Sequence, residues 1–435
     1  LNKKRQLLIK FYFIVFTLIA TIFLFFIFLS NFIGISGKLW PDQEFVNIFL
    51  SAVLGIVIFV SSTCILMIDA FDLTVKGEKF RIIHLIVSLT LFVFLFYFFK
   101  RIELISFFIF QIFLSFLLIF GTLYIIKKSG FSFKSEEKSN KKIIKDYISY
   151  FWNFSHPLII YSVVTMIAAI GSRWILQNFG GSIEQSYFAL ALKIGAIVFV
   201  FSNALMPLLN RRFVRLYEKL NFDELFKFYN NSSMLLLLIS LYISVICFFN
   251  AEFITLILGG KEFINATNIV LIMSISPIYQ SLWQVNGYLF FSTNRNKIYR
   301  NIGVFTQPFV LLLSFYFIAP KELFGLDLGA TGLAIQYIIL QFVVVNIMAF
   351  YNYRFLKNNP YLFYVNQILF FIIFFSIGLI VKKIILFLEI KSFVAFLFFT
   401  FIFSLIFVIT LLLMPNFFGF QNRQEMLNFI KIKKT

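Results

Sequence analysis

The chain has 435 residues, of which 61% are hydrophobic and 13% charged, and its mean hydropathy is +0.93. Soluble domains are about half apolar and about a quarter charged, so this composition excludes a soluble protein and predicts a polytopic membrane protein. The formal net charge of +19 would suggest a nucleic-acid partner for a soluble chain, but here the positions of the charges argue against one. The two cysteines and the two histidines are far apart in the sequence, so no disulfide framework, metal site or cofactor is expected.

Twelve apolar segments are long enough, or nearly so, to cross about 30 Å of hydrocarbon as α-helices. Their predicted limits are 9–33, 47–68, 83–99, 104–126, 157–179, 186–208, 232–250, 266–291, 302–319, 329–353, 364–381 and 392–414. The first segment is too long for a signal peptide and lacks a small-residue cleavage site. The expected fold class is therefore all-α, a polytopic membrane bundle of about 12 transmembrane helices.

Lys and Arg are distributed unevenly between the loops that join these segments. Alternate loops, with the two chain ends, carry 28 of the 38 Lys and Arg residues, and the other loops carry eight. By the positive-inside rule the basic loops face the cytoplasm, so both termini are predicted to be cytoplasmic, in agreement with the even number of spans. Two basic segments, 209–230 and 421–434, are predicted to lie as amphipathic helices on the anionic inner leaflet.

The only long polar break in the apolar pattern is 127–150, which is rich in Lys and Ser. We interpret it as a cytoplasmic linker between two lobes. The predicted organisation is an N-terminal lobe of four spans (1–126), a C-terminal lobe of six spans (151–355), and a final helix pair with a cytoplasmic tail (356–435).

Two cations, Arg173 and Lys193, lie within predicted spans. A cation in hydrocarbon costs roughly 3 kcal/mol on insertion scales, so both are candidates for substrate binding in a cationic cavity. In a helix, Lys193 falls on a stripe of small and polar residues that should face other helices or a cavity, whereas the bulky side should face lipid. The stripe is Ser186, Ala189, Lys193, Ala196, Val200, Asn203 and Pro207, and the bulky side is Phe188, Leu192, Phe199 and Leu205.

Each cation also has a structural alternative. Lys193 could extend to the outer surface or pair with Glu184 near the outer mouth. Arg173 precedes Trp174, a residue type common at membrane interfaces, and could be an interfacial anchor. Three residues share the helix side of Arg173 and favour a cavity instead: Ser162, Thr165 and Ala169.

Uncharged and acidic residues give further candidates. Gln280 and Gln284 lie on a polar stripe of the eighth span, which either joins helices or contacts substrate. Asp69 and Asp72 stand at the end of the second span, where gating or ion coupling is one interpretation. A solvated helix-end pair is the other interpretation, because Asp72 and Lys76 are four residues apart.

Several short segments fall in the order and spacing of one known family. They are HPL at 156–158, SRWIL at 172–176, YFALALKI at 187–194, ALMPLL at 204–209, LGGKEFINA at 258–266, GYLFFSTNRNK at 287–297 and LGATGLAIQYI at 328–338. In these segments the chain resembles the polysaccharide-biosynthesis flippases. These are the O-antigen and lipid-linked-oligosaccharide translocases of the multidrug/oligosaccharidyl-lipid/polysaccharide exporter superfamily.

This resemblance implies a fold that usually has fourteen spans, so the first helix pair is expected to be missing from this chain. It implies translocation of an undecaprenyl-pyrophosphate-linked oligosaccharide from the cytoplasmic to the outer leaflet of the bacterial inner membrane, by rocking of the two lobes. The implied partners are this glycan lipid, membrane lipids, polysaccharide polymerase and other assembly proteins. Many members carry an Asp immediately before the position of Arg173, where this chain has Ser172.

Two other functions remain open. A cation-coupled exporter of small molecules or drugs, from the same superfamily, should carry acidic rather than basic cavity residues. A membrane polysaccharide polymerase or glycosyltransferase would need a large outer loop with catalytic acids, and WPDQE at 40–44 is a short loop. The sequence contains no GxxxxGK segment followed by Ser or Thr, so it does not predict a P-loop ATPase. The chain is therefore expected to be a transporter and not an enzyme.

Overall fold

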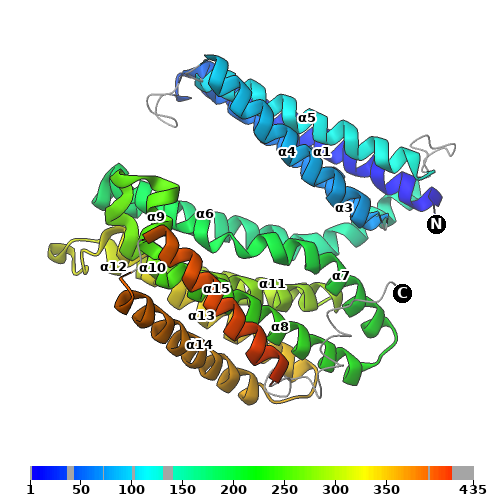
Figure 1. Ribbon diagram of the computed structural model, residues 1–435. Helices are drawn as coiled ribbons and strands as arrows, with labels where there is room; N and C mark the ends of the chain where they lie inside the picture. The colour runs from blue at the N-terminus through cyan, green and yellow to red at the C-terminus, as the bar shows by residue number, and fades with distance from the viewer. Residues whose placement is uncertain are drawn as a thin grey trace. The chain divides into compact units, whose positions relative to one another are not determined.

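A computed structural model of the chain describes residues 2–36, 44–71, 73–99, 103–130, 141–389 and 392–413. Over these ranges the chain forms α-helices joined by short connections, with two short 3-10 helices and no strand (Figure 1). Nine of the described helices are long and apolar enough to cross a membrane. The predicted fold class, an all-α polytopic membrane bundle, is therefore confirmed.

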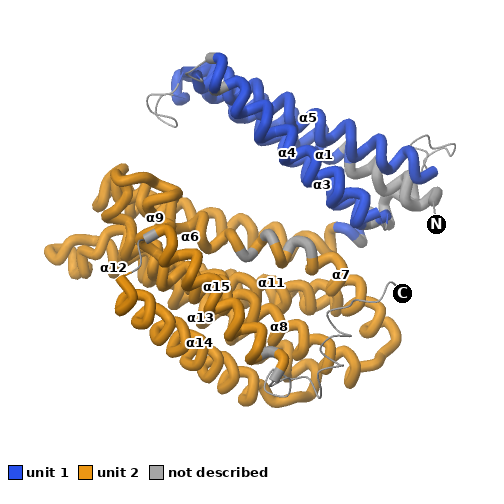
Figure 2. The backbone as a smooth tube through the Cα atoms, in the orientation of Figure 1, with its two compact units in different colours: residues 1–151 blue, residues 152–435 orange. Residues whose placement is uncertain are grey.

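The chain divides into two compact units, Leu1–Phe151 and Trp152–Thr435 (Figure 2). The helices of the first unit are α1 (Asn2–Phe32), α3 (Phe45–Ala70), α4 (Thr74–Phe99) and α5 (Leu104–Lys128). The next helix, α6 (Lys141–Gly195), begins in the first unit and continues into the second. Both ends of the predicted linker 127–150 are thus helical. The finer lobe boundaries proposed from the sequence stay predictions.

Apolar contacts along α3 hold the first unit together. This helix packs against α5 through Val57, Cys64 and Ile119, and Ile48 packs with Ile27 of α1. Many bulky residues on the remaining faces are exposed, as expected for helices whose outer side chains contact lipid rather than protein.

The second unit contains most of α6 and nine further α-helices. They are α7 (Val198–Glu218), α8 (Phe222–Phe249), α9 (Ala251–Gly259), α10 (Thr267–Met273), α11 (Ser276–Ser292), α12 (Asn296–Ile318), α13 (Gly329–Phe355), α14 (Tyr361–Phe387) and α15 (Ser392–Leu413). The 3-10 helices Lys261–Ala266 and Lys321–Leu323 lie in connections. Most of the residues of α8 from Leu225 onward are buried, because it contacts α7, α11, α14 and α15.

The predicted C-terminal helix pair, α14 and α15, packs on α8 within the second unit. Phe374 of α14 and Phe403 of α15 belong to the same buried core as Leu241 of α8. The hydroxyl oxygens of Tyr242 and Ser404 are 2.6 Å apart, so a hydrogen bond adds to the apolar contact between α8 and α15.

Two of the predicted spans are each divided into separate helices. The sixth is broken at 196–197, between α6 and α7, and the eighth at 274–275, between α10 and α11. The prediction of one continuous helix in each place is therefore wrong. At the first break the backbone N–H of Ile197 bonds to the carbonyl of Ile194 at 3.1 Å, which is the tighter 3-10 pattern that often accompanies an interruption.

The two breaks lie against each other. A Cβ atom placed on Gly195 would be 2.7 Å from Oγ of Ser276 and 3.0 Å from Nε2 of Gln280, which is closer than normal van der Waals contact. Glycine therefore lets the end of α6 approach the start of α11 this closely. Interrupted helices that meet inside a bundle recur at the binding sites of membrane transporters.

The segment 209–230 is not an amphipathic helix lying on the membrane surface, so this prediction is wrong. It comprises the end of α7, the connecting turn and the start of α8, and the two helices contact each other. Its apolar residues Phe213, Leu225 and Tyr229 are fully buried in the second unit. The amphipathic pattern that suggested a lipid surface is satisfied by neighbouring helices. The other predicted surface helix, 421–434, lies outside the described residues.

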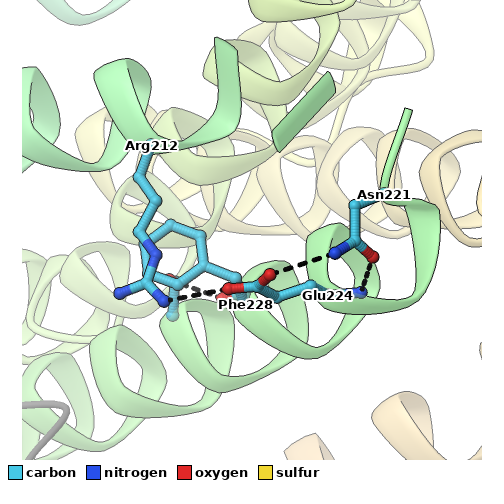
Figure 3. Close-up of polar contacts among 5 residues, drawn as sticks. Arg212, Asn221, Glu224 and Phe228 are labelled. Atoms are coloured by element: carbon cyan, nitrogen blue, oxygen red, sulfur yellow. Dashed lines mark hydrogen bonds and ion pairs between the residues drawn. The ribbon is translucent and has the colours of Figure 1, made fainter. Parts of the chain in front are cut away.

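Polar contacts also tie this α7–α8 connection together (Figure 3). Nη2 of Arg212 lies 3.4 Å from Oε1 of Glu224, and the Arg212 guanidinium stacks 4.5 Å from the centre of the Phe228 ring. Asn221 begins α8 by accepting a hydrogen bond from the backbone N–H of Glu224 at 3.2 Å. Arg212 thus contacts α8 through both Glu224 and Phe228, although its side chain stays half exposed.

A polar cluster joins α8, α11, α12 and α13 beside a basic loop. The Arg295 guanidinium stacks 3.9 Å from the centre of the Phe355 ring, and its Nη2 donates to Oδ1 of Asn352 at 2.6 Å. Asn352 donates in turn to Oδ1 of Asn286 at 3.0 Å, which also accepts from the Tyr229 hydroxyl at 2.6 Å. Burial lowers the pKa of Arg295 to about 10, which leaves it charged at neutral pH. The cluster connects α8, α11 and α13 to Arg295, the residue that immediately precedes α12.

Candidate binding cavity in the second unit

One cavity lies within the second unit, between α6, α11, α12 and α13. Its volume is about 310 Å³, which is at the lower end of the range for ligand pockets and is large enough for a small ligand or one sugar ring. Its polar lining is Thr165, Ser172 and Arg173 of α6, Thr306 and Gln307 of α12, and Gln336, Tyr337 and Gln341 of α13. Polar side chains are costly inside a membrane bundle, so their convergence makes the cavity the candidate functional site.

Arg173 brings a positive charge to the cavity wall. Thr165 and Ala169, which were expected to share its helix side, line the cavity with it, whereas Ser162 does not. No carboxylate is among the described residues that line the cavity. Arginine carries five N–H donors in a planar arrangement, so Arg173 can bind a phosphate or another anion with two parallel hydrogen bonds.

The three aliphatic hydroxyl groups of the lining belong to Thr165, Ser172 and Thr306. They donate to carbonyl oxygens of their own helices, those of Tyr161, Ala169 and Gly303, at 2.7, 3.1 and 3.1 Å. Their protons are therefore used within the helices, and the lone pairs of the oxygens remain as acceptors.

Three glutamines give the cavity a neutral polar surface. Gln307, Gln336 and Gln341 are almost fully buried, although they lie in otherwise apolar helices. Oε1 of Gln336 accepts a hydrogen bond from Oγ of Ser314 at 3.3 Å. Oε1 of Gln341 is buried and has no hydrogen-bond partner. A buried amide oxygen without a donor is unfavourable, so a ligand or water donor is expected to complete it.

Aromatic rings complete the lining. Phe188 meets Tyr337 edge to face, with ring centres 6.4 Å apart at 81°. Trp283 lines the cavity from α11, and its Nε1 donates to the Tyr299 hydroxyl at 3.2 Å, which holds the indole in place. The cavity thus combines one cation, neutral amides and fixed aromatic surfaces.

The structure places the two cations predicted from the sequence on different surfaces. Both residues are exposed, but Arg173 lines the cavity and Lys193 does not. Phe188 and Leu192, which were expected to face lipid, line the cavity instead. The helix therefore turns its bulky side inward, because large rings such as Phe188 bury more apolar area against α13 than the small residues would. A substrate-binding role for Lys193 stays a prediction.

The other predicted binding residues lie behind the cavity or outside the described side chains. Gln280 is buried beside the Tyr337 hydroxyl, and its Nε2 donates to Oγ of Ser276 at 2.6 Å, but it is not part of the cavity wall. The Oε1 atoms of Gln280 and Gln284 are buried without a partner. Asn203 belongs to α7, and its side chain is outside the described part of the structure.

The predicted gating or ion-coupling residues belong to the first unit. Asp69 lies in the last turn of α3 with its side chain partly exposed. Asp72 lies outside the described residues, as does Asp42 of the short WPDQE loop. Their roles stay predictions. No group of His, Cys, Asp and Glu suited to a metal occurs among the residues searched, which are the described ones.

Glu184, the alternative partner for Lys193, forms a hydrogen bond with the start of α13. Its Oε2 accepts a hydrogen bond from the backbone N–H of Ala330 at 2.7 Å. Ala330 is in the first turn of α13, where unpaired N–H groups and the helix dipole favour a carboxylate. Glu184 therefore caps α13 from a position 146 residues away in sequence.

We expect Glu184→Ala to destabilise the protein and Lys193→Gln to leave its stability unchanged. Loss of the acceptor at the start of α13 should cost about 1 kcal/mol, as for other helix caps, whereas an exposed side chain should cost less than about 0.5 kcal/mol. Thermal unfolding of both variants in detergent measures the difference. The opposite result would be equal destabilisation by the two single changes, with normal stability in the double variant Glu184→Gln with Lys193→Gln. That result would show that the two residues are paired.

Sequence reasoning missed most of the cavity. Gln307, Gln336 and Gln341 were not proposed, although an isolated amide in an apolar span is itself a signal, because a buried amide requires a partner. Trp283 and Tyr337 carry no such signal, since aromatic residues are abundant along the chain. Whether Trp283 and Tyr337 line the cavity depends on how α11 and α13 are rotated about their axes.

The fold class is now defined by structure as well as composition. The chain has the fold of the MATE proteins, which are polytopic helical membrane proteins. No protein-family model matches the chain, and no curated protein matches it in sequence. The likeness to solved structures therefore identifies the fold without identifying a substrate.

Three solved structures illustrate this likeness. A MATE protein with a proline-to-alanine substitution has a TM-score of 0.60 and 10% identity, over 79% of this chain and 77% of that chain. A MATE protein in complex with MaL6 has a TM-score of 0.58 and 10% identity, over 79% and 78%. The Vibrio cholerae MATE transporter VcmN, with an aspartate-to-asparagine substitution, has a TM-score of 0.56 and 14% identity, over 78% and 77%.

Proposed function

We propose that the chain is a membrane transporter that moves an undecaprenyl-pyrophosphate-linked oligosaccharide from the cytoplasmic to the outer leaflet. The oligosaccharide would be a repeat unit of O-antigen, capsule or exopolysaccharide. The observation that supports this proposal is the chemistry of the cavity in the second unit. Its described lining has an arginine, several amides and aromatic rings, and it has no carboxylate.

This lining suits the two polar parts of such a lipid. A pyrophosphate is an anion, and a guanidinium binds phosphate oxygens with two parallel hydrogen bonds. Sugars present hydroxyl groups and flat apolar faces, which pair with amides and aromatic rings. A cationic drug, by contrast, would be repelled by Arg173 and would find no acid on the described cavity wall.

A small-molecule exporter of the same superfamily is the second candidate. The likeness to MATE structures supports it at least as well as it supports a flippase, because the fold is common to both. The two candidates differ in the charge of the expected ligand. An anionic lipid suits Arg173, whereas a cation-coupled exporter of cationic drugs needs carboxylates in its binding site.

In the flippase proposal Arg173 contacts the pyrophosphate, and Lys193 contributes a further positive charge at an exposed position. Movement requires no covalent chemistry, so the chain is not an enzyme. The protein would act in the bacterial inner membrane with both termini in the cytoplasm. It would deliver its lipid to a polysaccharide polymerase and other assembly proteins.

The test uses the purified full chain in liposomes and two probes. The first is undecaprenyl pyrophosphate carrying one fluorescently labelled N-acetylhexosamine, and a membrane-impermeant quencher reports its passage between leaflets. The second is the cationic dye ethidium, whose accumulation is followed by fluorescence. We expect faster passage of the lipid than in protein-free liposomes and no change for ethidium. Ethidium transport without lipid passage would overturn the flippase proposal in favour of the exporter.

A further inference from the structure

The cavity in the second unit has a neutral part as well as a charged part. Arg173, Tyr337 and Gln341 all line this cavity, and the Gln341 amide lies within hydrogen-bonding reach of the Tyr337 hydroxyl. Gln341 is 5% exposed, and its Oε1 is buried without a hydrogen-bond partner. An unpartnered acceptor that is almost fully buried in a cavity wall indicates that a donor is supplied from the cavity.

The group that donates to Oε1 of Gln341 is expected to be neutral, because the charges around the cavity disfavour a cation. Arg173 in the same cavity disfavours a second positive charge nearby. No carboxylate lines the described cavity to compensate such a charge. A neutral O–H or N–H donor therefore fits Oε1 of Gln341 better than an ammonium group or a metal ion does.

An aromatic surface accompanies this acceptor in the same cavity. Trp283 is held by its hydrogen bond to the Tyr299 hydroxyl, and Tyr337 by its edge-to-face contact with Phe188. Rings held in this way lose little conformational entropy when a ligand packs against them. The C–H groups on one face of a sugar ring are apolar and pack on such surfaces, while its hydroxyl groups reach polar side chains at the edge.

We propose that this part of the cavity is a subsite for an uncharged sugar ring, with Gln341 as the acceptor for a sugar hydroxyl or acetamido N–H and Trp283 as the packing surface. The proposal rests on the flippase function proposed above and specifies which part of the substrate this wall recognises. Arg173 then takes the anionic part of the same molecule, and Gln341 determines how strongly the first sugar contributes to binding.

The test compares two lipids that differ only in the sugar. The purified full chain in detergent is titrated with undecaprenyl pyrophosphate and with undecaprenyl pyrophosphate carrying one N-acetylhexosamine. We expect the wild type to bind the glycosylated lipid about five- to tenfold more tightly, the gain typical of one or two hydrogen bonds. Gln341→Leu should lose this gain and still bind the unglycosylated lipid as the wild type does.

Gln367→Leu is the matched control. Gln367 is also a buried glutamine of the second unit, but it lies in α14, away from this cavity, and donates to Oδ1 of Asn346 at 3.2 Å. This variant should retain the preference for the glycosylated lipid. If Gln341→Leu does not fold, Trp283→Phe provides a second measurement. Indole emission of the wild type should change on addition of the glycosylated lipid only, and Trp283→Phe should lack this change.

The outcomes separate the subsite from the function. Equal affinity of the wild type for the two lipids, or a preference that survives in Gln341→Leu, would overturn the sugar subsite and leave the flippase proposal standing. If neither lipid bound to the protein, both the sugar subsite and the flippase proposal would be overturned. Loss of the preference in Gln341→Leu, with retention in Gln367→Leu, would support the assignment.

Discussion

Replacing Arg173 with Gln should lower lipid translocation by about 10- to 100-fold. This factor corresponds to the loss of one hydrogen bond to a charged group, and no other cation on the described cavity wall can replace it. Arg173→Lys should retain part of the activity, because Lys keeps the charge but loses the planar pair of donors. The measurement is passage of glycosylated undecaprenyl pyrophosphate in liposomes that contain each variant.

The control for Arg173→Gln is Lys193→Gln, which changes the other predicted cation and is measured in the same translocation assay. Protein levels and unfolding temperatures of each variant separate a binding defect from misfolding. Lys193→Gln should have a smaller effect than Arg173→Gln, because Lys193 does not line the cavity. Full activity of Arg173→Gln would remove the main support for an anionic substrate. A loss confined to Lys193→Gln would transfer the binding role to that residue.

Gly181→Ala should lower the free energy of unfolding by about 1–3 kcal/mol. Gly181 has φ 75° and ψ −174° at the kink inside α6, a conformation that is almost restricted to glycine. A Cβ atom there would meet no atom within 4 Å, so the expected cost comes from the backbone alone. Denaturant titration of the purified variant in detergent measures it.

Gly55→Ala is the matched control for this change. Gly55 lies within α3, and a Cβ atom there would also meet no atom within 4 Å. Alanine is favoured over glycine in a helix by about 1 kcal/mol, so this variant should be unchanged or slightly more stable. Equal stability of Gly181→Ala and the wild type would mean that α6 does not require the kink at this residue.

The kink at Gly181 also explains why the boundary between the two spans around it could be predicted. It separates the predicted spans 157–179 and 186–208, and the Gly180–Gly181 pair marks a change of direction in sequence. The break at 196–197 had no comparable signal. Gly195 is alone there, and its importance depends on the approach of Ser276, which is distant in sequence.

The sequence by itself determined the class of protein and the presence of a cation, Arg173, within a predicted span. Long apolar segments must form helices in a bilayer because their backbone polar groups have no water to bind, so composition and length were sufficient. Arg173 could be recognised because a cation in hydrocarbon is costly wherever its neighbours lie. Neither inference needs a residue from another helix.

Only the tertiary structure decided which side chains share the cavity. Phe188 was assigned to lipid and Lys193 to the cavity, yet Phe188 lines the cavity and Lys193 does not. Gln341 acquires its significance from Arg173 and Trp283, which belong to other helices. Helical periodicity shows which residues of one helix lie together. The rotation of that helix toward its neighbours depends on the sum of many small packing contacts, and no single span encodes that sum.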